Sequence, residues 1–113
     1  MSRDIIDINE KKVESFIEKM RPPVELREQM DLGYSYTQGV IELFEIRPIW
    51  ASENEYQNIP FAKIKFVKAQ RTWKLYWKRS SGKWEAYDPL PQSSTIEELL
   101  NCIDEDAKGC FKG

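Results

Sequence analysis

The sequence contains no histidine and only two cysteines, Cys102 and Cys110, among its 113 residues. The absence of histidine excludes Ser-His-Asp and Cys-His nucleophile arrangements, and also zinc sites with histidine ligands. The two cysteines are eight residues apart and form no CxxC motif, so a zinc site would need carboxylate ligands as well. We therefore predict an apolar packing role for Cys102, a reduced thiol at Cys110, and neither a metal nor a cofactor.

Long apolar runs are also missing from the sequence. No stretch approaches the roughly 20 apolar residues that a membrane-spanning helix needs, and the first ten residues resemble neither a secretory signal nor an arginine-rich transit peptide. With 41% hydrophobic residues and a net charge of −2, the composition is that of a globular protein. We expect one domain over residues 1–113, a cytoplasmic location and no membrane partner.

Both ends of the chain have the features of helices. Apolar side chains recur at helical spacing within residues 9–20, which predicts a helix there. Prolines 22 and 23 end this helix and precede the helix formers of residues 24–30, so we predict an N-terminal helical pair. The hydroxyl side chains of residues 93–95 precede a second apolar periodicity, which predicts a C-terminal helix over residues 96–106.

The middle of the chain has the alternation of β-strands, with a first hairpin about the Gln38-Gly39 turn. The predicted strands are residues 34–37, 40–46, 61–68, 72–79 and 84–87. Short turns join most of them, which predicts an antiparallel β-meander of about five strands. Because helices and strands do not alternate, the predicted fold class is α+β, with the helices packed on one sheet face. The polar run of residues 51–60 is the longest predicted loop.

Positive charge is concentrated in one part of the chain. Residues 61–84 contain eight lysines and arginines and no acidic residue, whereas the segments on either side each carry a net charge of −5. The strongly basic segment is also the segment with the clearest strand alternation. Its charge should therefore gather on one face of the sheet.

Alternation divides the predicted strands between a core face and a polar face. The core face receives Phe44 and Ile46 from the first hairpin, Trp84 and Ala86 from the last strand, and the apolar residues of the two central strands. Those central residues are Ala62, Ile64, Phe66, Trp73, Leu75 and Trp77. The polar face carries Glu45, Arg47, Lys63, Lys65, Lys74, Tyr76, Lys78 and Tyr87, with Lys83 at its rim.

The spacing of this polar face suits an extended polyanion. Side chains on one face of a strand are roughly 6.6–6.8 Å apart and neighbouring strands roughly 4.8 Å apart, which is comparable with successive phosphates of a nucleic-acid strand. Tyrosines among lysines can stack bases, as in sheets that bind single strands. We predict a non-catalytic module that binds nucleic acid or another polyanion. The predicted binding residues are Arg47, Lys63, Lys65, Lys74, Tyr76, Lys78, Lys83 and Tyr87.

Three other interpretations stay open. Lysine is an ordinary solubilising residue on an exposed antiparallel face. The face could instead meet an acidic segment such as residues 104–106 of a second copy, which would make the protein a protein-interaction or homodimerisation domain. An enzyme would need Glu45, Arg47 and a tyrosine in a cleft beneath the 51–60 loop, lined in part by Trp50.

Short motifs along nearly the whole chain resemble a known family. They are Arg21-Pro22-Pro23, Asp31-Leu32-Gly33-Tyr34, Glu42-Leu43-Phe44-Glu45-Ile46-Arg47-Pro48 with Trp50, Lys65-Phe66-Val67-Lys68, Trp73-Lys74-Leu75-Tyr76-Trp77, Trp84 with Tyr87 and Pro89, Ile103-Asp104-Glu105-Asp106 and Gly109-Cys110-Phe111. Together they resemble the bacterial family catalogued as domain of unknown function 3024. The resemblance implies a small bacterial, cytoplasmic protein, and it supplies no activity, cofactor or catalytic residue.

Overall fold

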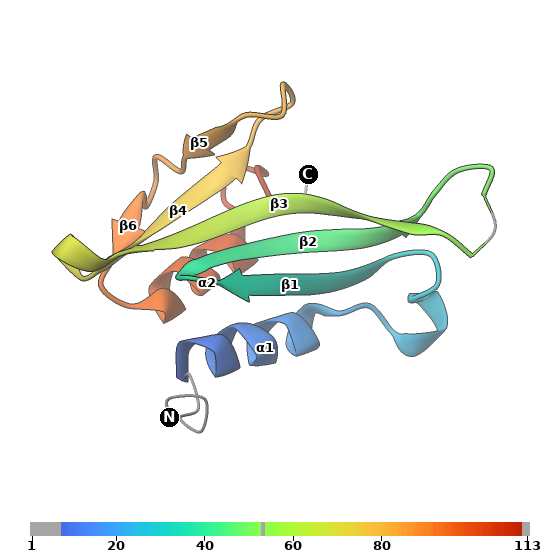
Figure 1. Ribbon diagram of the computed structural model, residues 1–113, viewed down its shortest axis with the longest axis horizontal. Helices are drawn as coiled ribbons and strands as arrows, with labels where there is room; N and C mark the ends of the chain where they lie inside the picture. Colours follow the sequence, from blue (N-terminus) through green and yellow to red (C-terminus); the bar gives the residue numbers. More distant parts are fainter. Residues whose placement is uncertain (1–7, 53, 112–113) are drawn as a thin grey trace.

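The computed structural model describes residues 8–52 and 54–111, with a helix at each end and a sheet between them (Figure 1). The helices are α1 (Ile8–Met20) and α2 (Ile96–Glu105). The strands are β1 (Asp31–Thr37), β2 (Val40–Pro48), β3 (Tyr56–Val67), β4 (Thr72–Lys78), β5 (Trp84–Ala86) and β6 (Gln92–Ser93). They form one antiparallel sheet in the order β1-β2-β3-β4-β5, with β6 paired to β4. The predicted α+β class is confirmed.

The predicted N-terminal helical pair is wrong, because only its first member is an α-helix. After α1 the chain forms the 3₁₀ turn η2 (Val24–Leu26) and then enters β1. Val24 is 70% exposed and Leu26 is 45% exposed, so this segment has no apolar side buried against the core. A short helix without such packing is marginal in water. Within the residues described here, no helix is long and apolar enough to cross a membrane.

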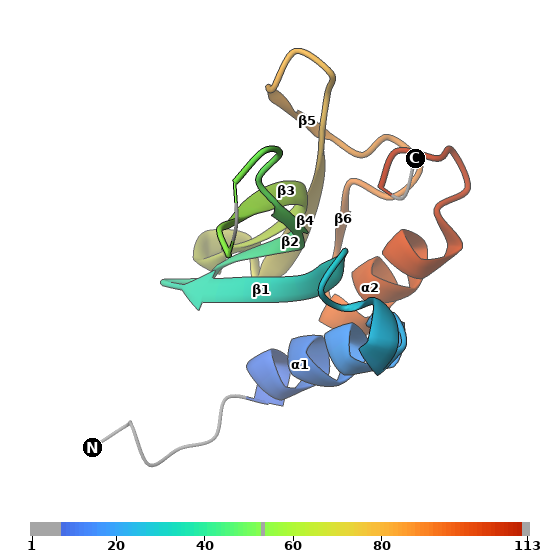
Figure 2. The same cartoon turned by 90° about the vertical axis from the view of Figure 1, so that its right-hand side faces the viewer.

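One apolar cluster joins both helices to the sheet. Its members are Val13 and Ile17 of α1, Ile96, Leu99, Leu100 and Ile103 of α2, Ile41, Leu43, Ala62, Ile64, Trp73 and Leu75 of the strands, and Tyr87 and Phe111 outside these elements. Figure 2 shows α1 and α2 lying beside one another, and Lys12 Nζ pairs with Glu97 Oε2 at 2.6 Å between them. The predicted core positions of β3 and β4 are therefore confirmed, with Phe66 and Trp77 partly buried against this cluster.

Strand β2 faces the opposite way from the prediction. Thr37 pairs with Val40 across a tight turn whose central residues, Gln38 and Gly39, have φ angles of 52° and 79°. This short turn fixes the register, which buries Ile41 and Leu43 rather than Phe44 and Ile46. The last two lie on the other face over Gly33, where a Cβ atom would be only 2.7 Å from Phe44 Cε1. Glu45 and Arg47 consequently share the side of Leu43, and their predicted facing is wrong.

Strand β5 is also reversed, because the turn of residues 79–83 sets its register. Arg79 N donates to the Lys83 carbonyl oxygen at 2.8 Å, and the ladder then pairs Lys78 with Trp84. Directly paired residues share a face, so Trp84 lies outside with Lys78. Alternation turns Tyr87 inward, where it is 1% exposed and its ring centre is 4.8 Å from that of Phe111. The predicted core positions of Trp84 and Ala86, and the predicted outer position of Tyr87, are wrong.

The second half of the predicted loop of residues 51–60 is strand. Strand β3 begins at Tyr56, and its pairing with β2 extends to Pro48, so only residues 49–55 connect the two strands. Figure 1 shows the resulting hairpin extending away from the helices. Pro60 is accommodated where the β2–β3 register shifts, which is a position that tolerates a missing backbone donor.

An ion pair ties the end of α1 to the start of β1. Arg21 donates from Nε and Nη2 to the two carboxylate oxygens of Asp31, at 2.9 and 2.8 Å. Arg21 Nη1 also pairs with Glu18 Oε2 at 3.1 Å. The hydrogen bonds from Arg21 lower the pKa of Asp31 below its ordinary value, and a backbone N–H from Leu32 acts in the same direction.

This ion pair predicts a loss of stability in acid. Because the pKa of Asp31 is lower in the folded chain, its contribution is present above the unfolded value of about 3.9 and is lost as the pH falls through the folded value. Asp31→Asn should therefore lower the free energy of unfolding at pH 7 and flatten its decline in acid. Urea unfolding at neutral and acidic pH measures both effects. Glu18→Gln is the control, because Glu18 is an exposed partner of the same arginine. An unchanged decline in Asp31→Asn would contradict this role.

Candidate functional site

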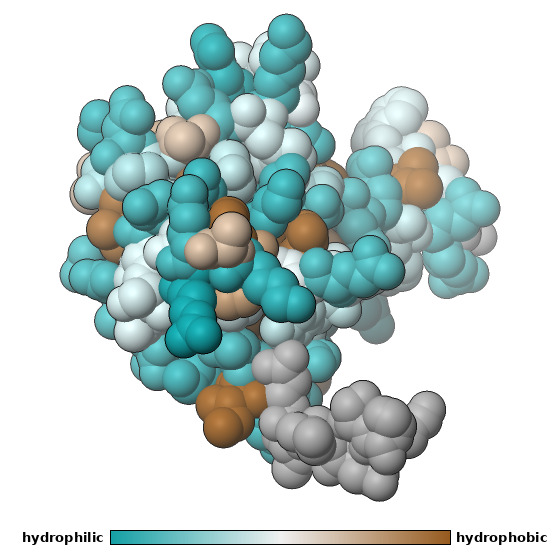
Figure 3. Space-filling model, turned by 60° about the vertical axis from the view of Figure 1, so that its left-hand side comes forward, coloured by the Kyte–Doolittle hydropathy of each residue, from teal (hydrophilic) through white to brown (hydrophobic). Residues whose placement is uncertain are grey.

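The outer face of β3 and β4 gathers most of the predicted basic residues. The ladder pairs Lys65 with Lys74 and Lys63 with Tyr76, and it pairs Lys78 with Trp84. We call this surface the lysine face, and its members are Lys63, Lys65, Lys74, Tyr76, Lys78 and Trp84. Figure 3, which brings the left-hand side of Figure 1 forward, shows mostly hydrophilic residues around the β3–β4 turn.

Two aromatic rings lie among these lysines. Lys63 Nζ is 4.9 Å from the ring centre of Trp84 and 5.5 Å from that of Tyr76. Lys78 Nζ is 5.7 Å from the ring centre of Trp84. These are cation–π distances, and both rings stay partly exposed. The lysine face therefore presents cations and aromatic surface together.

Within the part of the chain that the structure describes, the positive charge of the lysine face is not neutralised by ion pairs. Among residues 8–52 and 54–111, no ion pair includes Lys63, Lys65, Lys74 or Lys78. Glu42 of β2 is the register partner of Lys63, but the Lys63 ammonium lies over the Trp84 ring instead. Lys65 and Lys74 stand directly opposite each other, and such like-charge pairs destabilise an antiparallel ladder.

Three predicted binding residues lie off this face. Arg47 is on the core side of β2, where its Nε donates to Glu45 Oε1 at 2.8 Å. Tyr87 is in the core, and burial raises the pKa of its hydroxyl. Lys83 is exposed in the turn before β5, next to Trp84 and at the rim, as predicted. The placements of Arg47 and Tyr87 were wrong because both depended on strand registers that the turns set differently.

Two residues of this region were not predicted. Trp84 belongs to the lysine face, and the length of the 79–83 turn was the signal that could have placed it there. Gln92 of β6 pairs with Lys74 and so extends the same surface. No pattern indicates β6, because a strand of two residues between Pro91 and a helix is too short to show alternation.

Glu45 and Arg47 line a separate cavity of about 250 Å³. Its other described lining residues are Met20, Met30, Leu32, Phe61 and Phe111. No tyrosine and no residue of the 49–55 connection is among them. Trp50 is 91% exposed, so it does not form the cleft that an enzyme was predicted to need beneath that loop.

The two cysteines are free, half-buried thiols, and burial raises the pKa of each. In the described part of the chain, no three histidine, cysteine or acidic side chains come together in an arrangement that could hold a metal ion. The chemistry that the candidate site offers is thus that of ammonium groups and aromatic rings.

Comparison with known proteins identifies the chain at the level of its family. No curated protein and no solved structure matches it significantly. One family model, described as a domain of unknown function, matches residues 2–113 and agrees with the resemblance seen in the sequence motifs. The chain therefore belongs to the family Domain of unknown function (DUF3024).

Proposed function

We propose that the protein is a non-catalytic binding module whose lysine face binds nucleic acid or another polyanion. The observation that carries the proposal is the directly opposed Lys65–Lys74 pair, which stands without an ion-pair partner among the described residues. Opposed like charges cost stability in a ladder. A chain of phosphates lying over the two strands would supply the missing negative charge.

The aromatic rings extend the same proposal. Tyr76 and Trp84 lie between lysines of neighbouring strands, and Trp84 takes the stacking role that the sequence suggested for Tyr87. Base stacking on an aromatic side chain contributes about 1–3 kcal/mol per base and tolerates any base. We therefore favour a single strand, whose bases are free to stack, over a duplex.

The proposal includes no catalytic step. The sequence has no histidine, and Glu45 and Arg47 form an ion pair with each other beside an apolar cavity. We also propose a bacterial protein of the cytoplasm, where nucleic acid is within reach. The resemblance of its motifs to a bacterial family supports this location.

Binding of a labelled single-stranded oligonucleotide should be strongly salt-dependent. If the four lysines each neutralise one phosphate, the slope of log affinity against log salt should be about −3. Affinity should then fall about 50-fold between about 50 and about 200 mM salt. Fluorescence anisotropy measures this, with a duplex of the same sequence as the control for strand form. Absence of binding at the lower salt, or an affinity independent of salt, would contradict the proposal.

A second candidate is a protein-interaction domain. Trp50 is almost fully exposed at the tip of the β2–β3 hairpin, and Ile49, Tyr56 and Ile59 are exposed near it. Exposed aromatic and aliphatic groups on a projecting arm are typical of protein contacts. A negative oligonucleotide result would favour this candidate. Light scattering over a range of concentrations would then distinguish a homodimer from a domain that needs a different partner.

A further inference from the structure

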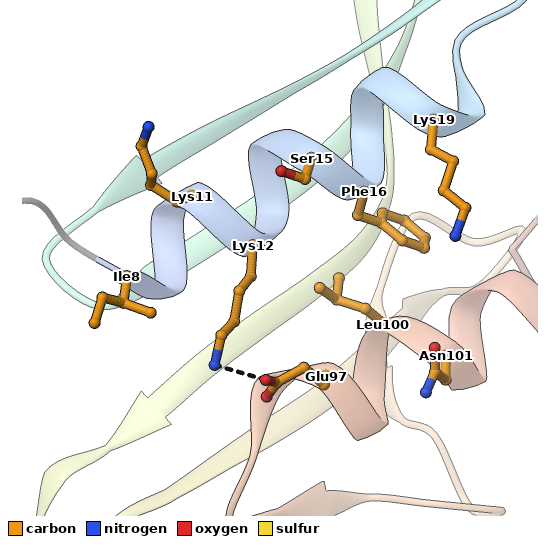
Figure 4. Close-up of a pocket in the computed structure, with 9 residues that line it drawn as sticks. All are labelled: Ile8, Lys11, Lys12, Ser15, Phe16, Lys19, Glu97, Leu100 and Asn101. Atoms are coloured by element: carbon orange, nitrogen blue, oxygen red, sulfur yellow. Dashed lines mark ion pairs between the residues drawn. The ribbon is translucent and has the colours of Figure 1, made fainter.

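A groove between α1 and α2 lies away from the lysine face and has a different character. Its volume is about 390 Å³, which is within the range of small-molecule sites. The lining combines apolar residues with three lysines of α1. Figure 4 shows these side chains, which come from both helices.

The floor of the groove is apolar, and its accessible surface belongs to Phe16 and Ile8, because Leu100 is only 5% exposed. Phe16 and Leu100 face each other from the two helices, and Ile8 lies at one end, where it is 66% exposed. The lining residues of α1 extend from Ile8 to Lys19, a length of about 17 Å along the helix axis. An aliphatic chain laid along this floor would remove apolar surface from water.

The rim of the groove is basic. Among the described lining residues, the rim has three lysines, Lys11, Lys12 and Lys19, and one carboxylate, Glu97, in a chain whose net charge is −2. Lys12 pairs with Glu97, whereas neither Lys11 nor Lys19 has an ion-pair partner among the described residues. Lys19 lies at the same end of the groove as Asn101, so an ammonium and an amide N–H donor are available there.

We infer that this groove binds a single-chain fatty carboxylate. The aliphatic chain lies over Phe16 and Leu100, and the carboxylate meets Lys19 at one end. The methylene stems of the rim lysines extend the apolar floor while their ammonium groups stay in water. The surplus of positive charge favours an anionic amphiphile over a neutral or cationic one of the same length.

The probe is decanoate, added to the full ¹⁵N-labelled chain below its micelle-forming concentration and followed by amide NMR shifts. The shifts should concentrate in α1 and α2 and leave β3 and β4 unchanged. Each methylene that the groove buries should raise affinity about fourfold, so octanoate should bind about 15-fold more weakly than decanoate. Shifts spread evenly over the protein, or no shifts, would overturn the inference.

Three variants and three other ligands test the site itself. Ser15 is exposed at the groove, so Ser15→Trp should fill it and abolish decanoate binding, whereas Glu14→Trp, outside the lining, should not. Lys19→Gln should weaken decanoate severalfold and leave decanol unchanged, and this variant decides the matter if Ser15→Trp does not fold. Equal affinity for decyltrimethylammonium, or unchanged decanoate affinity in Lys19→Gln, would overturn the inference. Binding of an acidic helical peptide in the groove, together with no binding of decanoate, would also overturn it.

Discussion

Tyr87→Ala is expected to lower the free energy of unfolding by about 3–5 kcal/mol, the range for truncating a large buried aromatic side chain. Tyr87 is 1% exposed and its ring packs on Phe111 in the core. Tyr76→Ala is the matched control, because the same residue type lies on the opposite face of the sheet and is partly exposed. It should cost about 1 kcal/mol or less. Urea unfolding of the three proteins gives both values.

Variants of the same two tyrosines also separate the contribution of core packing from that of oligonucleotide binding. Tyr76→Ala should weaken oligonucleotide binding, since its ring lies next to the Lys63 ammonium on the lysine face. Tyr87→Phe keeps the buried ring and should change neither binding nor most of the stability. A small loss of stability in both Tyr76→Ala and Tyr87→Ala would show instead that Tyr87 lies on the outer face, as expected from the sequence.

The parts of the fold that the sequence predicts are those in which local periodicity suffices. Ala62 and Ile64 alternate with lysines within one uninterrupted strand, and Trp73 and Leu75 do the same in the next. No knowledge of the partner strand is needed to assign their faces. The lysines of these two strands share a face for the same reason, so their position on the outer face was predicted correctly.

The errors arise where the side of the sheet on which a residue lies depends on a turn or on pairing with a distant strand. Phe44 and Trp84 are apolar on the outer face, so hydrophobicity alone assigned them to the core. The register that places them is set by the two-residue turn before β2 and by the longer turn before β5. The same reasoning assigned Arg47 and Tyr87 to the binding face, whereas the observed registers place both residues on the core side.

The start of β3 shows a different limit of the sequence. Residues 56–60 include asparagine, glutamine and proline, which are typical of loops. They are strand because β2 continues to Pro48 and provides backbone partners for them. Such pairing is non-local, so no pattern within the segment itself indicates it.

Lys65→Glu should change stability and binding in opposite directions. Lys65 and Lys74 are direct register partners, so the substitution replaces a like-charge pair with an opposite-charge pair. The free energy of unfolding should rise by about 0.2–1 kcal/mol, and the melting temperature by up to a few degrees. Oligonucleotide affinity should fall about tenfold or more, because a charged contact with a phosphate is replaced by repulsion.

The double variant Lys65→Glu/Lys74→Glu separates these two effects completely. Two opposed glutamates restore the like-charge pair, so stability should return close to that of the unmodified protein, while affinity should fall further, to about 100-fold below it or lower. Lys108→Glu, an exposed position beyond α2, makes the same charge change away from the lysine face and should preserve most of the binding. Stability therefore rises and then falls across the series, whereas affinity falls at each step. If affinity is unchanged in both variants, or is reduced as much by Lys108→Glu, the lysine face is not the binding surface.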